Sequence, residues 1–303
     1  MAQSAAKFVS SAWQKGIFDG KVVFCTGGSG DICSAQVRAL VYLGANACIV
    51  GRNKSKAESV ARDIAAVRPG AKVLGLGDAD VREAKVLEDA ARACVDELGS
   101  IDFAIAGAAG NFLAPFLQLS PNAFRTIVDI DLIGAFNTAK ATAPYLIRSS
   151  AASKGASGRI IFISSTTQYT GRHLVTHGAS AKAGIDALSA QLAIELGPRG
   201  ITSNVIAPGP IAGTEGTRSL LDAGKAQEVS KHIPRGRLGS LKDMSNAAVY
   251  LFSDAGDFVN GTILVVDGGA WRTGGGSIGA GIPYPESVTS DEPFAARLKK
   301  ARL

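Results

Sequence analysis

The 303-residue chain lacks the features that mark membrane, secreted and metal-binding proteins. It contains no apolar run of about 18 residues, so we expect no membrane span. Residues 1–20 hold neither an apolar signal core nor an arginine, which argues against a secretory signal and a mitochondrial transit peptide. The four cysteines have no CxxC spacing and the three histidines no ligand spacing. We therefore expect reduced thiols and no metal site.

Aromatic residues are also scarce, at 6%, and basic residues form no long run despite a net charge of +6. A nucleic-acid surface would need clustered basic and aromatic side chains, so we expect no nucleic-acid partner and favour a small ligand that carries phosphate. The high apolar content, 46%, excludes a disordered chain. The 36 glycines have no three-residue period, which excludes a collagen-like structure.

Short β-branched runs alternate with longer helical patterns along the chain. This alternation predicts an α/β fold, a Rossmann-like doubly wound parallel sheet with helices on both faces. Runs such as Val22–Phe24 and Ile160–Ile163 are continuously apolar, as in strands buried on both faces. We expect a single domain with its core at about 18–270, an N-terminal extension (1–17) and a C-terminal tail (271–303). The expected strands are Lys21–Thr26, Ala47–Val50, Lys72–Leu76, Asp102–Ala106, Arg159–Ser164, Thr202–Ala207 and Thr262–Val266, and the expected helices are Ile32–Leu43, Lys54–Val67, Glu83–Leu98, Pro121–Leu146, Ala179–Leu196 and Lys242–Ser253.

A glycine-rich turn follows the first expected strand, with the sequence Thr-Gly-Gly-Ser-Gly-Asp-Ile-Cys at 26–33. Such a turn before a helix lets backbone N–H groups approach a pyrophosphate. The second strand ends in Gly-Arg-Asn-Lys at 51–54, without the acidic residue that binds the ribose of NAD. Arg52 can pair with a 2′-phosphate instead, which favours NADPH. The alternative is that Arg52 and Lys54 belong to a solvated helix start.

The order of these motifs resembles the short-chain dehydrogenase/reductase family over about residues 18–270. Besides the glycine-rich turn, the resemblance rests on Asp80-Val81, Ala109-Gly110 and Pro208-Gly209, each of which follows an expected strand. It implies cofactor contacts from Gly27, Ser29, Gly30, Asp31, Ile32, Arg52, Asp80, Val81, Ala109, Gly110, Lys182, Pro208, Gly209, Ile211 and Thr214.

Several positions depart from the usual family pattern. Gly178 stands four residues before Lys182, where the family has its catalytic tyrosine, and Asp131 replaces the family asparagine. These changes, together with Gly107–Phe112 and Ser180-Ala181-Lys182, resemble the peroxisomal 2,4-dienoyl-CoA reductase branch and its fungal members. The resemblance implies NADPH-dependent reduction of 2,4-dienoyl-CoA to trans-3-enoyl-CoA, an auxiliary step of peroxisomal β-oxidation. Another short-chain enzyme such as an enoyl-thioester reductase, or a non-catalytic NADP-binding protein, is the alternative.

Four side chains are the candidates for catalysis. Lys182 would bind the nicotinamide ribose and add a positive field, unless it pairs with Asp186 one turn later. Asp131 would donate a proton or orient water, unless it is a structural carboxylate. Ser165 falls where the family has its serine, and Tyr169 either contacts the thioester oxygen or is an aromatic lid residue. The residues expected to line the acyl site are Asn111 and Phe112.

The chain ends in Ala301-Arg302-Leu303, which is similar to the Ser-Lys-Leu peroxisomal address. We therefore expect a peroxisomal location and recognition by the peroxisomal import receptor, with the cytosol as the second choice and a frayed basic tail as the alternative. The family resemblance also suggests a homo-oligomer, a dimer or tetramer, formed through the Pro121–Leu146 and Ala179–Leu196 helices.

Overall fold

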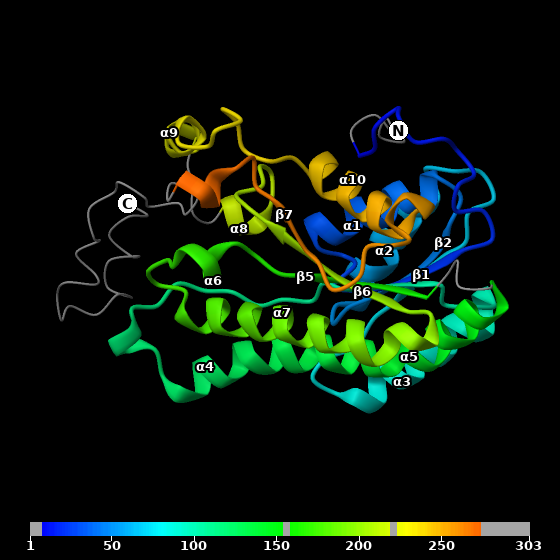
Figure 1. Ribbon diagram of the computed structural model, residues 1–303. Helices are drawn as coiled ribbons and strands as arrows, with labels where there is room; N and C mark the ends of the chain where they lie inside the picture. Colours follow the sequence, from blue (N-terminus) through cyan, green and yellow to red (C-terminus); the bar gives the residue numbers. More distant parts are fainter. Residues whose placement is uncertain (1–7, 154–157, 219–222, 274–303) are drawn as a thin grey trace.

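A computed structural model describes residues 8–153, 158–218 and 223–273. Its centre is a parallel sheet of seven strands in the order β3-β2-β1-β4-β5-β6-β7, which confirms the expected Rossmann-like fold (Figure 1). The chain reverses its direction of winding between β1 and β4, where such folds bind dinucleotides. The strands are β1 (Val22–Thr26), β2 (Asn46–Val50), β3 (Val73–Leu76), β4 (Phe103–Ala106), β5 (Arg159–Ile163), β6 (Thr202–Pro208) and β7 (Ile263–Val266).

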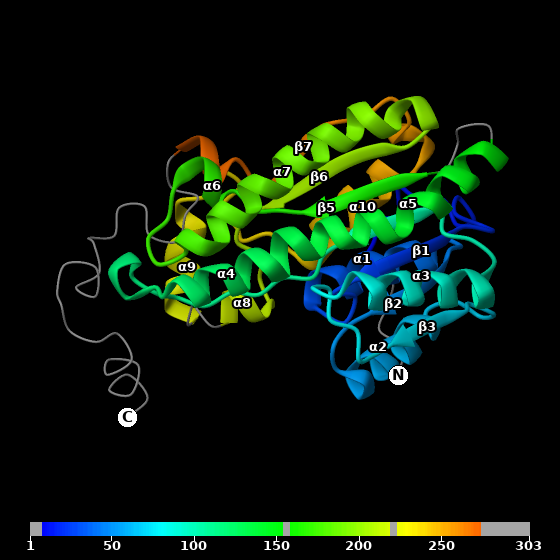
Figure 2. The same ribbon diagram turned by 90° about the horizontal axis from the view of Figure 1, so that it is seen from below.

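Helices cover both faces of this sheet. α1 (Asp31–Tyr42), α2 (Lys54–Ala65) and α10 (Leu241–Phe252) pack on one face, and α3 (Ala84–Leu98), α5 (Gly134–Ala152) and α7 (Thr176–Leu196) on the other (Figures 1 and 2). β1, β4 and β5 are buried along their whole length, which explains their uninterrupted apolar sequences. Three shorter helices stand near the carboxyl ends of the strands: α6 (Thr167–Thr170), α8 (Glu215–Arg218) and α9 (Ala223–Lys231).

The stretch expected as one helix over Pro121–Leu146 is divided in the structure. Ser120 caps α4 (Pro121–Val128) by accepting a hydrogen bond from the N–H of Ala123. A π-helical segment, Asp129–Ile133, then joins α4 to α5. The expectation of one regular helix was therefore wrong at its centre. Because a π turn holds one extra residue, it changes which side chains face the protein interior.

Part of the expected N-terminal extension packs against the core. Phe8 and Val9 are buried, and the Oδ1 atom of Asn246 accepts hydrogen bonds from the Ser10 N–H and the Trp13 indole. Residues 9–13 therefore lie against α10. Nearly all of the expected C-terminal tail lies outside the described residues. Among the helices that the structure describes, none combines the length and apolarity required to cross a bilayer.

Candidate active site

Two adjoining cavities lie where the strands end. The larger, of about 810 Å³, extends along the loops after β1, β2 and β4, and the smaller, of about 280 Å³, lies between the β4, β5 and β6 loops. Lys182 lines both cavities. Every residue that the sequence predicted to contact a dinucleotide lines one or both of them. The residues predicted to contact a cofactor therefore lie together, at the switch point of the sheet.

The glycine-rich turn surrounds the inner end of the larger cavity. Gly27 has a φ of +67°, and a Cβ atom there would stand 2.7 Å from the backbone of Ala108. Gly30 occupies the N-cap of α1, and no side chain caps this helix. The first N–H groups of α1 are thus available to an anion. A close backbone approach and an uncapped helix start fit the pyrophosphate of a dinucleotide.

The outer end of this cavity carries positive charge. Arg52, Asn53 and Lys56 line it, whereas Lys54 does not. Of the two cations that the sequence left open as a solvated helix start, Arg52 faces the cavity and Lys54 does not, and Lys56 supplies a second charge there. Asp80 forms an ion pair of 2.6 Å with Arg82, and hydrogen bonding from that arginine lowers the pKa of Asp80. The cations at this end fit a phosphate group on the cofactor ribose.

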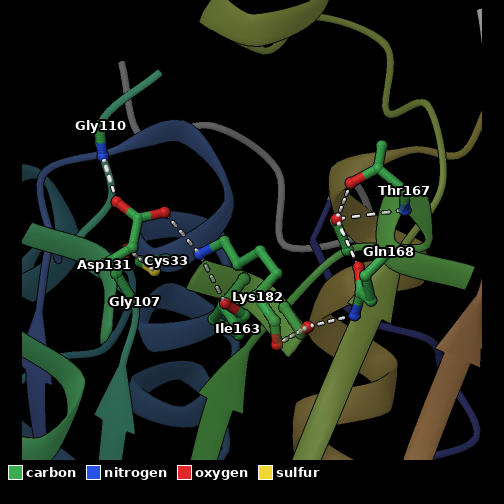
Figure 3. A network of polar contacts seen from close by, with 10 residues as sticks. Cys33, Gly107, Gly110, Asp131, Ile163, Thr167, Gln168 and Lys182 are labelled. Carbon is green, nitrogen blue, oxygen red and sulfur yellow. Dashed lines mark hydrogen bonds and ion pairs between the residues drawn. The ribbon is translucent and has the colours of Figure 1, made fainter. Parts of the chain in front are cut away.

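A polar network joins three elements at the boundary of the two cavities (Figure 3). The Gly110 N–H donates to Oδ1 of Asp131 at 2.7 Å, and the Lys182 ammonium lies 3.1 Å from Oδ2. Lys182 also donates to the carbonyl of Ile163 at 3.0 Å. Asp131 is only 1% exposed, because the π-helical segment turns it inward. Both oxygens of Asp131 face donors, which favours an orienting role over proton donation.

The alternative pairing of Lys182 with Asp186 does not occur. Oδ2 of Asp186 instead accepts hydrogen bonds from the Tyr169 hydroxyl and from the Gln168 amide. Tyr169 therefore points toward Asp186, and it is not among the residues that line the two cavities. Burial, with the carboxylate as a second cause, raises the pKa of Tyr169. The structure thus separates Tyr169 from the Asp131–Lys182 network.

Ser165 lies in the smaller cavity, as the sequence predicted. Its hydroxyl donates to Oε1 of Gln168 at 3.0 Å and lies 2.6 Å from the hydroxyl of Thr167. The Gln168 amide in turn donates to the Ser164 hydroxyl, which donates to the backbone carbonyl of Lys182 at 3.4 Å (Figure 3). Ser165 is therefore linked to Lys182 only indirectly, and no hydrogen bond between the two side chains is present among the described residues.

The two residues expected at the acyl site have different surroundings. Asn111 lines the smaller cavity, but Phe112 stacks on the ring of His177 with centroids 4.2 Å apart and lines neither cavity. Gly178 also lines the smaller cavity, and a Cβ there would have only Oδ1 of Asn111 as a neighbour, at 3.8 Å. The position where the family carries tyrosine is thus open space next to Asn111.

Sequence reasoning missed three features of this region. His177 is fully buried, and burial lowers its pKa. Arg172 lines the smaller cavity, and no motif had indicated it. Asp31 was predicted only as a cofactor residue, yet its Oδ2 accepts from the Glu215 N–H at 2.8 Å and pairs with Arg218 at 3.0 Å. Asp31 therefore ties α8 to the glycine-rich turn.

The winding of the sheet, the glycine-rich turn and the lysine on α7 define a nicotinamide-dependent oxidoreductase of the short-chain type. Residues 29–270 match the family model described as enoyl-(acyl carrier protein) reductase. A short-chain dehydrogenase from Bacillus anthracis has the same architecture, with a TM-score of 0.72, 34% identity and coverage of 83% of this chain and 96% of that one. The chain belongs to the short-chain dehydrogenase/reductase family, whose members bind a nicotinamide cofactor.

Within this family, the chain is similar to reductases of known name. The peroxisomal 2,4-dienoyl-CoA reductase of Saccharomyces cerevisiae, which produces (3E)-enoyl-CoA, is 47% identical over 270 residues, which cover 88% of this chain and 90% of that protein. The peroxisomal 2,4-dienoyl-CoA reductase of Arabidopsis thaliana is 36% identical over 267 residues, which cover 87% of this chain and 88% of that protein.

Proposed function

We propose that this protein reduces 2,4-dienoyl-CoA to (3E)-enoyl-CoA with NADPH. The observation that carries the proposal is the buried Asp131–Lys182 pair beside an open Gly178, in a cavity that adjoins the dinucleotide cavity. Ketone reduction requires an acid that protonates an alkoxide, and the usual tyrosine is missing here. A conjugated thioester needs no such acid, because its oxygen carries the charge as an enolate. Similarity to the yeast and plant dienoyl-CoA reductases supports the same substrate.

The residues of the smaller cavity have separate roles in this reaction. When bound, the cofactor would supply the hydride that the distal diene carbon takes up. The π electrons of the diene then shift toward the thioester, and its oxygen gains the negative charge. Lys182 would hold the cofactor ribose, and its ammonium adds a positive field to the cavity. Asp131 fixes both Lys182 and the backbone of Gly110, so it acts as an orienting carboxylate, and Ser165 and Asn111 line the space for the acyl group.

The experiment compares two substrates in the presence of the intact protein. Loss of NADPH absorbance is expected with a 2,4-dienoyl-CoA and not with a simple 2-enoyl-CoA. Lys182→Ala and Asp131→Ala should each remove nearly all of this activity while the fold survives. The opposite substrate preference would identify an enoyl-thioester reductase, and NADPH binding without turnover of either substrate would identify a non-catalytic protein.

The preference for NADPH over NADH is a separate part of the proposal. Arg52 and Lys56 line the end of the larger cavity where a 2′-phosphate would lie. Arg52→Ala should raise the Kd for NADPH about tenfold, since a charge-assisted hydrogen bond contributes roughly 1.5 kcal/mol or more. The Kd for NADH should stay unchanged. Lys54→Ala is the matched control, because Lys54 carries the same charge nearby but does not line the cavity.

We further propose that the protein is peroxisomal and is recognised by the import receptor through Ala301-Arg302-Leu303, which lie outside the described residues. The yeast and plant relatives are named as peroxisomal proteins, which supports the location. A fluorescent protein fused to the N-terminus should colocalise with a peroxisomal marker. Removal of the last three residues should leave it in the cytosol, and an unchanged location would contradict the role of this tripeptide.

A homo-oligomer through α4–α5 and α7 is the last part of the proposal. Phe124, Ile133 and Phe136 project from the α4–α5 stretch and Ile194 from α7, with exposed fractions between 36% and 71%. Apolar side chains of this size on one layer favour contact with a second subunit. Sedimentation should give a dimer or tetramer. Phe136→Asp should shift the protein toward a monomer, and a native protein that sediments as a monomer would contradict the proposal.

A further inference from the structure

Arg172 is a partly buried arginine with an unsatisfied nitrogen. Its Nε atom is shielded from solvent and has no hydrogen-bond acceptor. Arg159, in contrast, is buried with its charge satisfied, because it donates to the Ser253 carbonyl at 2.9 Å and to Asp257 at 3.0 Å. A shielded donor without an acceptor costs free energy, and no contact of Arg172 with a described side chain offsets this cost.

The position of Arg172 identifies the kind of group that it can meet. Arg172 lines the smaller cavity together with Lys182, Gly178 and Asn111, and it does not line the larger, dinucleotide cavity. Phosphates at the glycine-rich turn are therefore not its partners. A volume of about 280 Å³ lies at the lower limit of ligand pockets and suits the reacting end of an acyl-CoA better than its nucleotide.

Several polar groups near the smaller cavity are already engaged elsewhere. The Ser165 hydroxyl donates to Gln168, and Gly178, at the position of the family tyrosine, has no side chain. The Tyr169 hydroxyl donates to Asp186, and Tyr169 lines neither cavity. The Lys182 ammonium is already engaged with Asp131 and with the Ile163 carbonyl. We propose that Arg172 is a catalytic residue that donates hydrogen bonds to the thioester oxygen of the substrate and stabilises the charge that develops there.

In this step, the new C–H bond forms at the distal diene carbon and the electron pair of the neighbouring double bond moves toward the thioester. The carbonyl π bond opens, and its electron pair rests on oxygen beside the guanidinium of Arg172. The electron pair on oxygen then re-forms the carbonyl π bond while the α-carbon takes a proton from water, which gives the 3-enoyl product and hydroxide. Arg172 keeps its own protons throughout, as expected of arginine. This inference rests on the proposed function.

The test compares Arg172→Ala, Arg172→Lys and Arg172→Met with the unaltered protein. Loss of one oxyanion donor typically lowers kcat by about 10²–10³-fold. We expect a loss of about 100-fold or more in Arg172→Ala, a smaller loss in Arg172→Lys, and an unchanged Kd for NADPH in both. Added guanidinium ion should restore part of the activity of Arg172→Ala. Arg62→Ala, on the exposed face of α2 and away from both cavities, is the matched control and should retain full activity.

Thermal unfolding separates a catalytic role from a structural one. Because the Nε atom of Arg172 is shielded from solvent without an acceptor, Arg172→Met should melt at the same temperature as the unaltered protein or higher. A lower melting temperature together with weaker NADPH binding would assign a structural role and overturn the inference, as would activity of Arg172→Ala within threefold of the unaltered protein. If the unaltered protein does not reduce a dienoyl-CoA, the proposed function itself fails, and the inference fails with it.

Discussion

Replacement of Asp131 by alanine should destabilise the protein by an amount that its contacts determine. The change leaves the Lys182 ammonium with only the Ile163 carbonyl at 3.0 Å, and the Gly110 N–H without its acceptor. Removal of one partner of a buried ion pair costs about 3–5 kcal/mol. The Lys182 side chain is 13% exposed and lines open cavities, so we expect a loss of stability at the lower end of this range, about 3 kcal/mol. At about 2 °C per kcal/mol for a chain of this length, the melting temperature should fall by ~6 °C.

The assay is thermal unfolding without cofactor for Asp131→Ala, Lys182→Met and the double variant. Because the two side chains interact directly, the double variant should lose about 2 kcal/mol less than the sum of the two single losses. Lys85→Met is the matched control, since Lys85 pairs with Asp89 at 2.8 Å on the exposed surface of α3. Such a surface pair contributes at most about 1 kcal/mol. Strictly additive losses, or a loss in Asp131→Ala no larger than that in Lys85→Met, would refute the reasoning.

Three further substitutions test other parts of the site. Gly178→Tyr places a ring where only Asn111 is near, so it should block dienoyl-CoA reduction and leave the NADPH Kd within about threefold; unchanged turnover would show that the substrate lies elsewhere. Asp31→Ala removes the ion pair with Arg218, so the backbone amides of residues 215–218 should exchange hydrogen faster, as measured by mass spectrometry. The Tm should change by less than about 2 °C, because this ion pair is exposed. Burial lowers the pKa of His177, so the unfolded chain binds a proton at this histidine more readily than the folded protein does, and stability should fall as the pH drops below about 6.5. In His177→Phe the fall in Tm between pH 7 and pH 5 should be smaller. An identical dependence of Tm on pH in the variant and the unaltered protein would contradict this prediction.

Much of the fold could be predicted because local sequence and tertiary structure agree. The seven strands were found from short β-branched and apolar runs between helical patterns, although buried polar residues such as Arg159, Ser203 and Asn204 also lie in them. The cofactor turn was found because Gly27 needs a positive φ and a close backbone neighbour, which only glycine allows. These features depend on residues adjacent in sequence, so a pattern can indicate them.

The rest of the site depends on contacts between distant segments. The π-helical segment was missed because its apolar spacing still resembles an α-helix, and its altered hydrogen bonding is set by packing against α7 and the β4 loop. The direction of Tyr169 was open because its spacing from Lys182 does not determine which way the side chain points from the short helix α6. Arg172 had no sequence signal, since the shielding of its Nε atom and its place in the smaller cavity depend on three-dimensional packing.

The π-helical segment separates the direction of the Asp131 side chain from the packing of α5. A π turn takes up one extra residue and leaves the helical turns on either side of it in their own directions. Ala135, Ala139 and Leu146 of α5 therefore stay buried on the sheet, while Asp131 within the turn faces the Gly110 N–H and Lys182. The position of this carboxylate can thus be adjusted at the turn without a new arrangement of the core.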